Sequence, residues 1–266
     1  MSANNDSIQK TLIVAILLCL VCAVFVAGAA VGLRKEQSEN RANDKRAAVL
    51  QAAGLYEADK PVAAQFEAKI QTRIVNLTEG RFANDAELQE IRAAGLNVDN
   101  FDQKKSSKLP AVSRVLSSEE DKASIKRLEK FAAVFIVGSG DQIEKIILPV
   151  HGYGLWSTLY GFLALQGDMN TVVGLGFYSH AETPGLGGEV DNPKWKSLWV
   201  GKHVFNDKGD VAISVVKGGA AEGNPYQVDG LSGATLTSRG VDNLVRFWVG
   251  DLGFGKLIDN LKAQGA

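Results

Sequence analysis

Residues Asp229–Trp248 read DGLSGATLTSRGVDNLVRFW, a glycine-rich turn that leads into an amphipathic segment. The apolar residues of that segment recur at helical spacing and so share one face: Val241, Leu244, Val245 and Trp248. Three hydroxyl residues, Thr235, Thr237 and Ser238, stand where the turn meets the predicted helix. Such residues often cap helices, but the free N–H groups and positive dipole end of a helix also suit a phosphate. The stretch therefore predicts either a simple helix cap or an anion site.

Strand patterns precede this stretch. Residues 132–138 and 141–150 read as two strands around the turn SGDQ, and residues 171–180 read as another strand. Residues 203–206 and 211–218 flank the turn DKGD, which predicts a hairpin.

Helical patterns dominate the first half of the chain. A charged and then alanine-rich run predicts a helix over 35–53, and Asn84 or Asp85 is placed to cap another over 85–95. The apolar residues of 62–77 have helical spacing and predict a third helix: Phe66, Ile70, Ile74 and Leu77. Together these patterns predict an α+β fold, in which helices pack a twisted and mainly antiparallel sheet.

The segment Thr11–Leu33 contains no charged residue. As a helix it spans about 34 Å at ~1.5 Å per residue, against about 30 Å for the hydrocarbon core of a bilayer. A cleaved signal peptide is the alternative, because the small residues at 27–30 offer a cleavage site. The apolar run is longer than the roughly 7–15 residues of a signal peptide core, so we expect an uncleaved, single-pass membrane anchor.

The charges around this anchor leave its orientation open. Lys10 precedes the span, and five basic residues follow it: Arg34, Lys35, Arg41, Lys45 and Arg46. A positive-inside count places the C-terminal body in the cytoplasm, but long domains translocate largely regardless of charge.

The composition argues against several kinds of site. The net charge of −1 gives no basis for nucleic-acid binding. Cys19 and Cys22 share one face of the apolar helix, either as packing residues or as ligands of a metal shared with a partner, and the rest of the chain has no cysteine for disulfides or thiolate chemistry. The three histidines lack metal-binding spacing, so we expect no metal site and expect His151 and His180 to shape their loops.

Three glycine-rich loops carry the candidate functional residues. PVHGYGLW covers 149–156, HAETPGLGGEV covers 180–190, and the third loop is the turn before Thr235. Neither a P-loop nor a GxGxxG fingerprint is present. The segment DGLSGAT, Asp229–Thr235, resembles the flavinylation motif of the FMN-binding domain family, and HGYGLW and ETPGLG are similar to other motifs of that family.

The resemblance implies a fold, a cofactor and an attachment residue. In the family motif an Asp is followed by Ser/Thr-Gly-Ala-Thr, and the last Thr carries FMN through a phosphoester bond, which here implies Thr235. Ser232 and Thr237 are then expected to cap the helix or donate to the phosphate, while the small residues Gly233 and Ala234 let the ligand approach the backbone. The domains implied are an anchor over 1–34, a helical linker with the first part of the soluble domain over 35–130, and the FMN-binding domain over 131–266.

The resemblance also gives roles to the other loops. Glu182 and Thr183 are expected to hydrogen-bond the isoalloxazine edge or the ribityl hydroxyls. Leu186 and Gly187 are expected against the ring face, with Trp156 packed nearby. Lys217 is expected to stabilise the negative charge that develops when the flavin accepts an electron, since local charges tune flavin electronics.

With its single span, the chain most resembles the C subunits of sodium-translocating NADH:quinone reductases, and the G subunits of Rnf complexes are the alternative. The implied function is electron transfer, with no substrate chemistry of its own, in a complex that oxidises NADH, reduces quinone and translocates sodium. The implied partners are the other subunits and a flavin transferase, in the bacterial inner membrane with the soluble domain in the periplasm. A tethered module with a noncovalent ligand and a structural anchor with a degenerate site are competing hypotheses.

Overall fold

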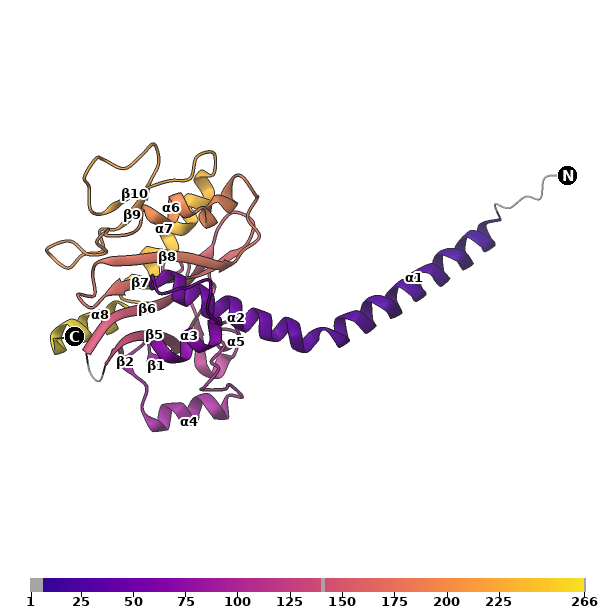
Figure 1. Ribbon diagram of the computed structural model, residues 1–266, viewed down its shortest axis with the longest axis horizontal. Coiled ribbons are helices and arrows are strands. Elements are labelled where there is room, and N and C mark those ends of the chain that lie inside the picture. The colour runs from indigo at the N-terminus through magenta and orange to yellow at the C-terminus, as the bar shows by residue number, and fades with distance from the viewer. Residues whose placement is uncertain (1–6, 140–141, 266) are drawn as a thin grey trace. The chain divides into compact units, whose positions relative to one another are not determined.

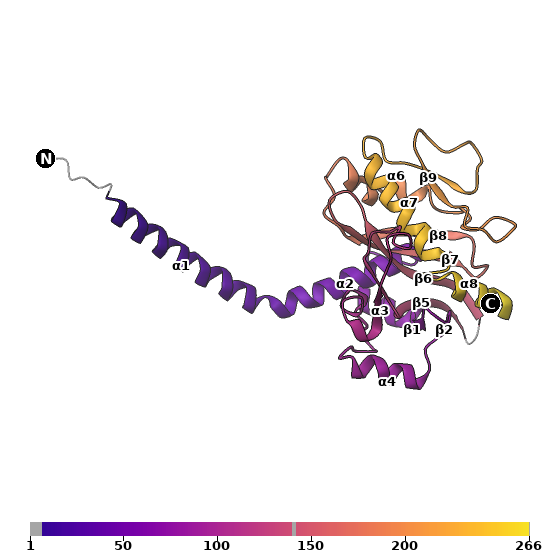
Figure 2. The same ribbon diagram turned by 180° about the vertical axis from the view of Figure 1, so that it is seen from behind.

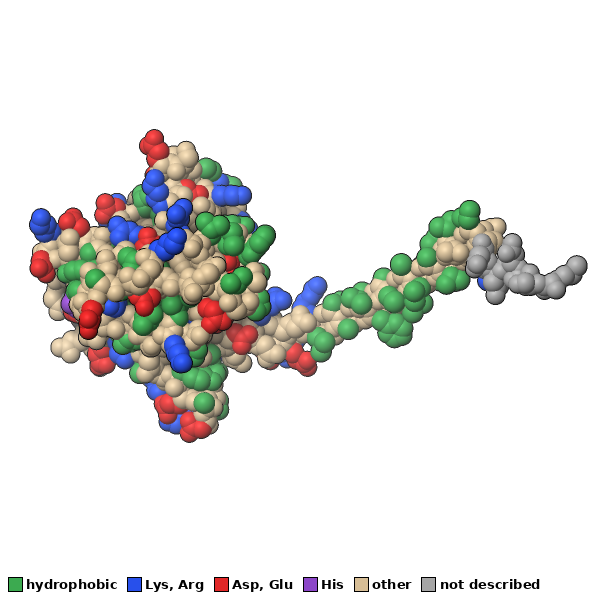
Figure 3. All heavy atoms as spheres, turned by 90° about the horizontal axis from the view of Figure 1, so that it is seen from above, with side chains coloured by type: hydrophobic (Ala, Val, Ile, Leu, Met, Phe, Trp, Pro, Cys, Tyr) green, Lys and Arg blue, Asp and Glu red, His purple; other side chains and the backbone are tan. Residues whose placement is uncertain are grey.

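The computed structural model describes residues 7–139 and 142–265. The chain divides into two compact units, with the division between Asp44 and Lys45. The first unit contains α1 (Ile8–Gly32) and the start of α2 (Arg34–Ala52). Helix α1 has 25 residues, none of them buried, and is long and apolar enough to be a candidate membrane span. Figure 3 shows hydrophobic side chains along its length. This helix therefore fits the predicted anchor.

The second unit is built on a six-stranded antiparallel sheet (Figure 1). Its strands, in spatial order, are β2 (Arg81–Phe82), β1 (Gln71–Asn76), β5 (Phe131–Ser139), β6 (Gln142–Tyr153), β7 (Thr158–Gln166) and β8 (Val172–Ser179). The predicted α+β fold with a mainly antiparallel sheet is confirmed. Strands β1 and β2 belong to this sheet although they lie before residue 131, the predicted start of the FMN-binding domain. That boundary stays a prediction.

Alternating side chains divide the core between the two faces of the sheet. In β5, Ala132, Val134 and Ile136 pack with the buried residues of α7 (Thr235–Val249) and α8 (Gly255–Gln264). On the opposite face, Phe135 packs with Val49 and Leu50 from the end of α2, beside α3 (Val62–Lys69). Figure 1 and Figure 2 show α3 and α7 on opposite sides of the sheet. Residues two apart on a strand share a face, so this one strand supplies both layers of the core.

Short elements complete the second unit. Before β5 lie α4 (Asp85–Ala93), α5 (Gln103–Ser106), a 3-10 turn (Pro110–Val112), β3 (Ser113–Val115) and β4 (Arg127–Glu129). After β8 lie a second 3-10 turn (Gly187–Asp191), α6 (Pro193–Ser197), β9 (Ser214–Val216) and β10 (Gln227–Asp229). The predicted cap of α4 is confirmed, because the side chain of Asn84 accepts from the backbone N–H of Glu87 at 3.0 Å.

Two predicted elements differ in the structure. The predicted helix over 62–77 is wrong in its second half, because α3 ends at Lys69 and residues Gln71–Asn76 form β1. Pairing of all six β1 residues with β5 outweighs their helical spacing. The predicted hairpin around DKGD is reduced to one bridge between Phe205 and Val211. Strand β9 instead pairs in parallel with β10, next to the start of α7.

Of the predicted SGDQ turn between β5 and β6, Gly140 and Asp141 lie outside the described residues. The two strands on either side of it are present and pair antiparallel from Phe135 opposite Ile147 to Ser139 opposite Gln142.

Candidate functional site

Helix α7 begins at Thr235 without a side-chain cap. The N-cap residue is Ala234, and Gly233 before it has φ = 73°, a left-handed conformation that glycine adopts without steric cost. Thr235 is exposed, and its hydroxyl has no hydrogen-bond partner among the described residues. The helix therefore presents free N–H groups and an unused hydroxyl at its N-terminus.

The other two hydroxyls of the stretch are buried and already used. Thr237 is 1% exposed and donates to Oε2 of Glu182 at 2.7 Å. Ser238 accepts from the backbone N–H of Leu231 at 2.8 Å and donates to the carbonyl of Ala234 at 3.0 Å. Ser238 thus closes the glycine turn, and of the three hydroxyls at the helix start only that of Thr235 is available to a ligand.

A cavity of about 620 Å³ lies beside Thr235. Four residues predicted to bind the cofactor or carry it line this cavity: Lys217, Ser232, Gly233 and Thr235. Arg239, one helical turn after Thr235, also lines it. Neither Lys217 nor Arg239 forms an ion pair with another described residue. These two cations and the helix N-terminus favour an anion beside Thr235, although two carboxylates also line the cavity.

Two carboxylates also line the cavity and bind the backbone beside it. Oδ1 of Asp229 accepts from the N–H of Ala220 at 2.5 Å, and Oδ1 of Asp242 accepts from the N–H of Val215 at 2.7 Å. Burial raises the pKa of Asp242. These bonds fix β9 and the loop after it, which carries Lys217, against β10 and α7.

Glu182 lies at the centre of the other two glycine loops. It is 5% exposed, and its carboxylate accepts from the N–H groups of Leu155, Trp156 and Ser157 at 3.0–3.2 Å, as well as from Thr237. Burial opposes ionisation, but the Thr237 hydroxyl and the three N–H groups together lower the pKa of Glu182. The carboxylate is therefore an internal acceptor, and the predicted direct bond from Glu182 to the flavin stays a prediction.

Of the remaining predicted residues, three are exposed and Gly187 is buried. Trp156 is 66% exposed and Leu186 is 46% exposed, and Thr183 is also exposed. Leu186 Cδ2 lies 3.3 Å from the position that a Cβ would take on Gly233, so it borders the turn before Thr235. Gly187 is buried beside Thr237 and Glu182. Trp156 and Thr183 are not among the residues that line the cavity.

His180 makes contacts within its loop, whereas His151 lies inside strand β6 opposite Tyr160. His180 contacts Asp191 with Nε2 at 2.8 Å, and its Nδ1 lies 3.2 Å from the N–H of Glu182. His151 is buried, stacks on Tyr160, and burial lowers its pKa to about 3.

Arg239 was not predicted from the sequence. The available signal was its position four residues after Thr235, which places the two side chains on the same helical face.

Comparisons with known proteins agree with this geometry. The model of the FMN-binding domain family matches residues 154–250. The C subunit of the Na(+)-translocating NADH-quinone reductase of Pseudomonas aeruginosa is 50% identical over 98% of each chain. That of Vibrio parahaemolyticus is 46% identical over 100% of this chain and 99% of the other. The crystal structure of Shewanella oneidensis NqrC matches with a TM-score of 0.74 and 36% identity, covering 85% of this chain and 99% of that one. The chain therefore belongs to the family of C subunits of Na(+)-translocating NADH-quinone reductases, with an FMN-binding domain.

Proposed function

We propose that the chain transfers electrons within the membrane complex of its family, through FMN held as a phosphoester on Thr235. The complex oxidises NADH, reduces quinone and translocates sodium ions. The observation that carries this proposal is the unused, exposed hydroxyl of Thr235 at the N-terminus of α7, beside a cavity with two unpaired cations.

The residues around Thr235 suit a phosphodiester. Such a group keeps one negative charge, which the free N–H groups of α7 and the side chains of Lys217 and Arg239 stabilise. Ser232 and Gly233 lie in the same cavity, where the first offers a hydroxyl and the second lets the phosphate approach the backbone. Ala234 is the N-cap residue and is buried, so its methyl group leaves the cavity open.

Exposed apolar side chains near the helix start suit a flavin ring. Leu186 borders the turn at Gly233, and Trp156 projects from a loop that Glu182 connects to α7. An aromatic ring that covers Leu186 and Trp156 removes apolar surface from water. Bound FMN supplies the one-electron chemistry that a protein side chain cannot. Thr183 is exposed, its carbonyl accepts from the N–H of Leu186 at 3.1 Å, and its hydroxyl is offered to the ring or the ribityl chain.

We further propose that α1 anchors the chain in the bacterial inner membrane with the second unit in the periplasm, where a flavin transferase attaches FMN. A covalent bond prevents loss of the flavin from a domain that no cytoplasmic FMN can reload. A reporter that is active only in the cytoplasm, fused after the last residue, is expected to be silent. An active reporter would contradict the periplasmic placement.

The covalent link separates this proposal from a tethered module with a noncovalent ligand. Denaturation releases a noncovalent flavin, whereas a phosphoester keeps it on the chain. We therefore expect the protein, purified from its native host and unfolded in guanidinium, to retain visible flavin absorbance after gel filtration. Loss of all flavin in that step would contradict covalent attachment.

A further inference from the structure

One carboxylate connects two of the glycine-rich loops to the first turn of α7. Oε1 of Glu182 accepts from the N–H groups of Leu155, Trp156 and Ser157 at 3.1, 3.0 and 3.1 Å. Oε2 of Glu182 accepts from the Thr237 hydroxyl at 2.7 Å. Glu182 itself belongs to the second loop and Thr237 to the first turn of α7. The three segments therefore meet at the two oxygens of one side chain.

Two glycines lie close against this carboxylate, which is 5% exposed. A Cβ on Gly154 would lie 2.6 Å from Oε1 of Glu182, and a Cβ on Gly187 would lie 2.8 Å from Oε2. The same Cβ on Gly187 would lie 2.5 Å from the Thr237 hydroxyl oxygen. Real Cβ atoms do not approach so closely, so the glycines of HGYGLW and ETPGLGG are the residues that let these loops close around Glu182.

No lysine or arginine of the described chain forms an ion pair with Glu182. Its negative charge is balanced by three successive backbone N–H dipoles, an arrangement that binds anions elsewhere in proteins, and by one hydroxyl. A neutral amide of the same shape turns an N–H₂ group toward some of these donors. The contact therefore depends on the charge of Glu182 and not only on its volume.

We infer that Glu182 is a positioning residue: its carboxylate holds the Trp156 loop at a fixed place relative to the first turn of α7, and so sets where the ring of an FMN on Thr235 can lie. The inference rests on the proposed function for its second half, the effect on the flavin. Its first half, the connection between loop and helix, concerns this chain alone. Rigid support of this kind limits the geometries open to a bound group.

Amide hydrogen exchange tests the connection directly, in the full chain without flavin in detergent. Glu182→Gln is expected to lower the protection of the Leu155, Trp156 and Ser157 amides by about tenfold or more, because hydrogen bonds to a charged acceptor are lost. Asp168→Asn is the matched control. Asp168 also accepts two backbone N–H groups, from Asn170 and Thr171 at 2.8 Å, and the Thr171 hydroxyl. Asp168 lies beyond the end of β7 that is roughly 26 Å from Thr158. The variant Asp168→Asn is therefore expected to leave the three amides protected.

A second pair of variants keeps the test decisive if Glu182→Gln does not fold. Thr237→Ser retains the hydroxyl that donates to Glu182, whereas Thr237→Val removes it with little change in volume. We expect Thr237→Ser to keep the protection of residues 155–157 and Thr237→Val to reduce it. Unchanged protection in Glu182→Gln would overturn the inference, and if that variant does not fold, unchanged protection in Thr237→Val would do so.

The positioning role is read from the flavin itself. In chain that carries flavin, Glu182→Gln is expected to change the visible circular dichroism of the flavin, and Asp168→Asn is expected to leave it unchanged. If Glu182→Gln loses protection of the amides of residues 155–157 but leaves the visible circular dichroism of the flavin unchanged, the positioning role is overturned. If the wild-type chain carries no flavin at all, the proposed function fails, and the exchange data still decide whether Glu182 connects the loop to the helix.

Discussion

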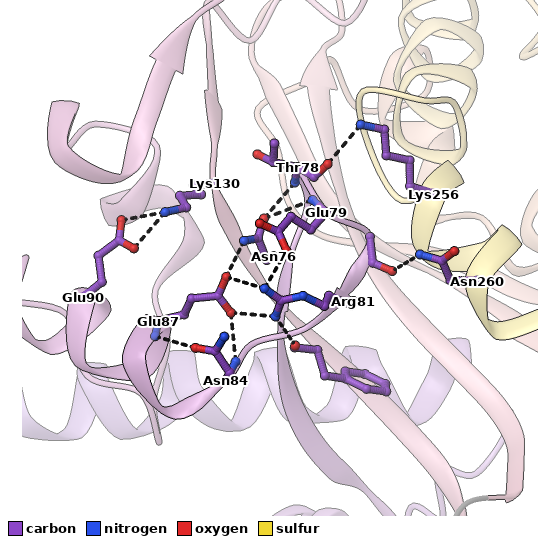
Figure 4. Close-up of polar contacts among 12 residues, drawn as sticks. Asn76, Thr78, Glu79, Arg81, Asn84, Glu87, Glu90, Lys130, Lys256 and Asn260 are labelled. Carbon is purple, nitrogen blue, oxygen red and sulfur yellow. Dashed lines mark hydrogen bonds and ion pairs between the residues drawn. The ribbon is translucent and has the colours of Figure 1, made fainter. Parts of the chain in front are cut away.

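Two polar clusters of the second unit differ in how their charges are satisfied. Around the β1–β2 turn, the Glu87 carboxylate accepts from Asn76 at 2.6 Å, from Arg81 at 2.9 Å and from the N–H of Asn84 at 2.8 Å (Figure 4). Beside α7, Lys217 and Arg239 have no such carboxylate partner, and the Thr235 hydroxyl has no acceptor among the described residues. The first cluster is complete within the chain, whereas the second leaves two cations and one hydroxyl without such partners among the described residues, which is what the proposed phosphoester requires.

On our proposal, the polar residues around Glu87 stabilise the fold, and those beside Thr235 bind the flavin phosphate. Lys256 and Asn260 of α8 donate to the carbonyls of Thr78 and Gly80 at 3.0 and 2.9 Å, so the β1–β2 turn is also attached to the last helix (Figure 4). Substitutions in this cluster are expected to change stability and not flavin content. Substitutions beside Thr235 are expected to do the reverse.

The largest effect on stability is expected for Glu87→Ala. It removes a carboxylate that closes the capping box of α4, leaves the Asn76 amide without its acceptor, and leaves Arg81 with only Glu79 and the Phe82 carbonyl. Loss of hydrogen bonds to a buried charged acceptor costs about 2 kcal/mol. Chemical denaturation of the flavin-loaded protein measures the change, and flavin content is expected to remain at the wild-type level. A loss of flavin without a loss of stability would contradict the assignment of this cluster to the fold.

The same carboxylate predicts a pH dependence. Burial alone would raise the pKa of Glu87, but Arg81, Asn84 and Asn76 together lower it to about 2, against about 4.3 in the unfolded chain. A lowered folded-state pKa stabilises the protein above about pH 4.3, and the contribution disappears as the pH falls toward 2. The difference in unfolding free energy between wild type and Glu87→Gln is therefore expected to shrink over that interval. A difference independent of pH would contradict the ionised pair.

Gly233→Ala is expected to lower stability less than Glu87→Ala does, and to reduce flavin attachment more. A side chain at φ = 73° costs about 1 kcal/mol, and the new Cβ lies 3.3 Å from Leu186. Gly209→Ala is the matched control, because Gly209 has φ = 85° and open space around it in the DKGD turn. Equal losses of stability, with reduced flavin attachment in Gly233→Ala alone, are expected. Equal flavin content in both variants would argue against the turn as part of the site.

The smallest change in stability is expected for the double variant Lys217→Ala, Arg239→Ala. Both side chains are exposed, so the unfolding free energy is expected to remain within about 0.5 kcal/mol. Removal of two positive charges makes reduction of a nearby flavin less favourable, and the midpoint potential is expected to fall by roughly tens of millivolts. Redox titration followed by visible absorbance measures it. An unchanged potential would place the flavin away from both cations.

The sequence predicted the local features of this site better than its long-range ones. Strands β5, β6 and β8, the cap of α4 and the helix behind Thr235 follow from period and capping chemistry within a few residues, whereas β1, β2 and β7 were not predicted as strands. The role of Glu182 depends on Thr237, 55 positions away, and on the loop at 155–157. No local pattern encodes such a contact, and a carboxylate in a glycine-rich loop equally resembles a ligand-binding group.

The error over 62–77 has the same origin. Phe66, Ile70 and Ile74 have helical spacing, but Ile74 and its neighbours pair with a strand more than fifty residues later in the chain. Local patterns could not choose among the hydroxyl residues at the start of α7. The resemblance to the FMN-binding domain family made that choice, because it pointed to Thr235. The structure adds the physical reason why Thr237 and Ser238 are unsuitable, because both are buried and bonded within the chain.

Tandem mass spectrometry of the tryptic fragment Gly218–Arg239 tests the central claim most directly. The fragment contains four hydroxyl side chains apart from its tyrosine, at Ser232, Thr235, Thr237 and Ser238. We predict the mass of FMN less one water on Thr235 in protein from the native host, and its complete loss in Thr235→Val but not in Thr235→Ser. Ser232→Ala is expected to retain the modification, because Ser232 only lines the cavity. An unmodified wild-type fragment, or FMN on Ser232 or Thr237, would contradict the assignment of Thr235.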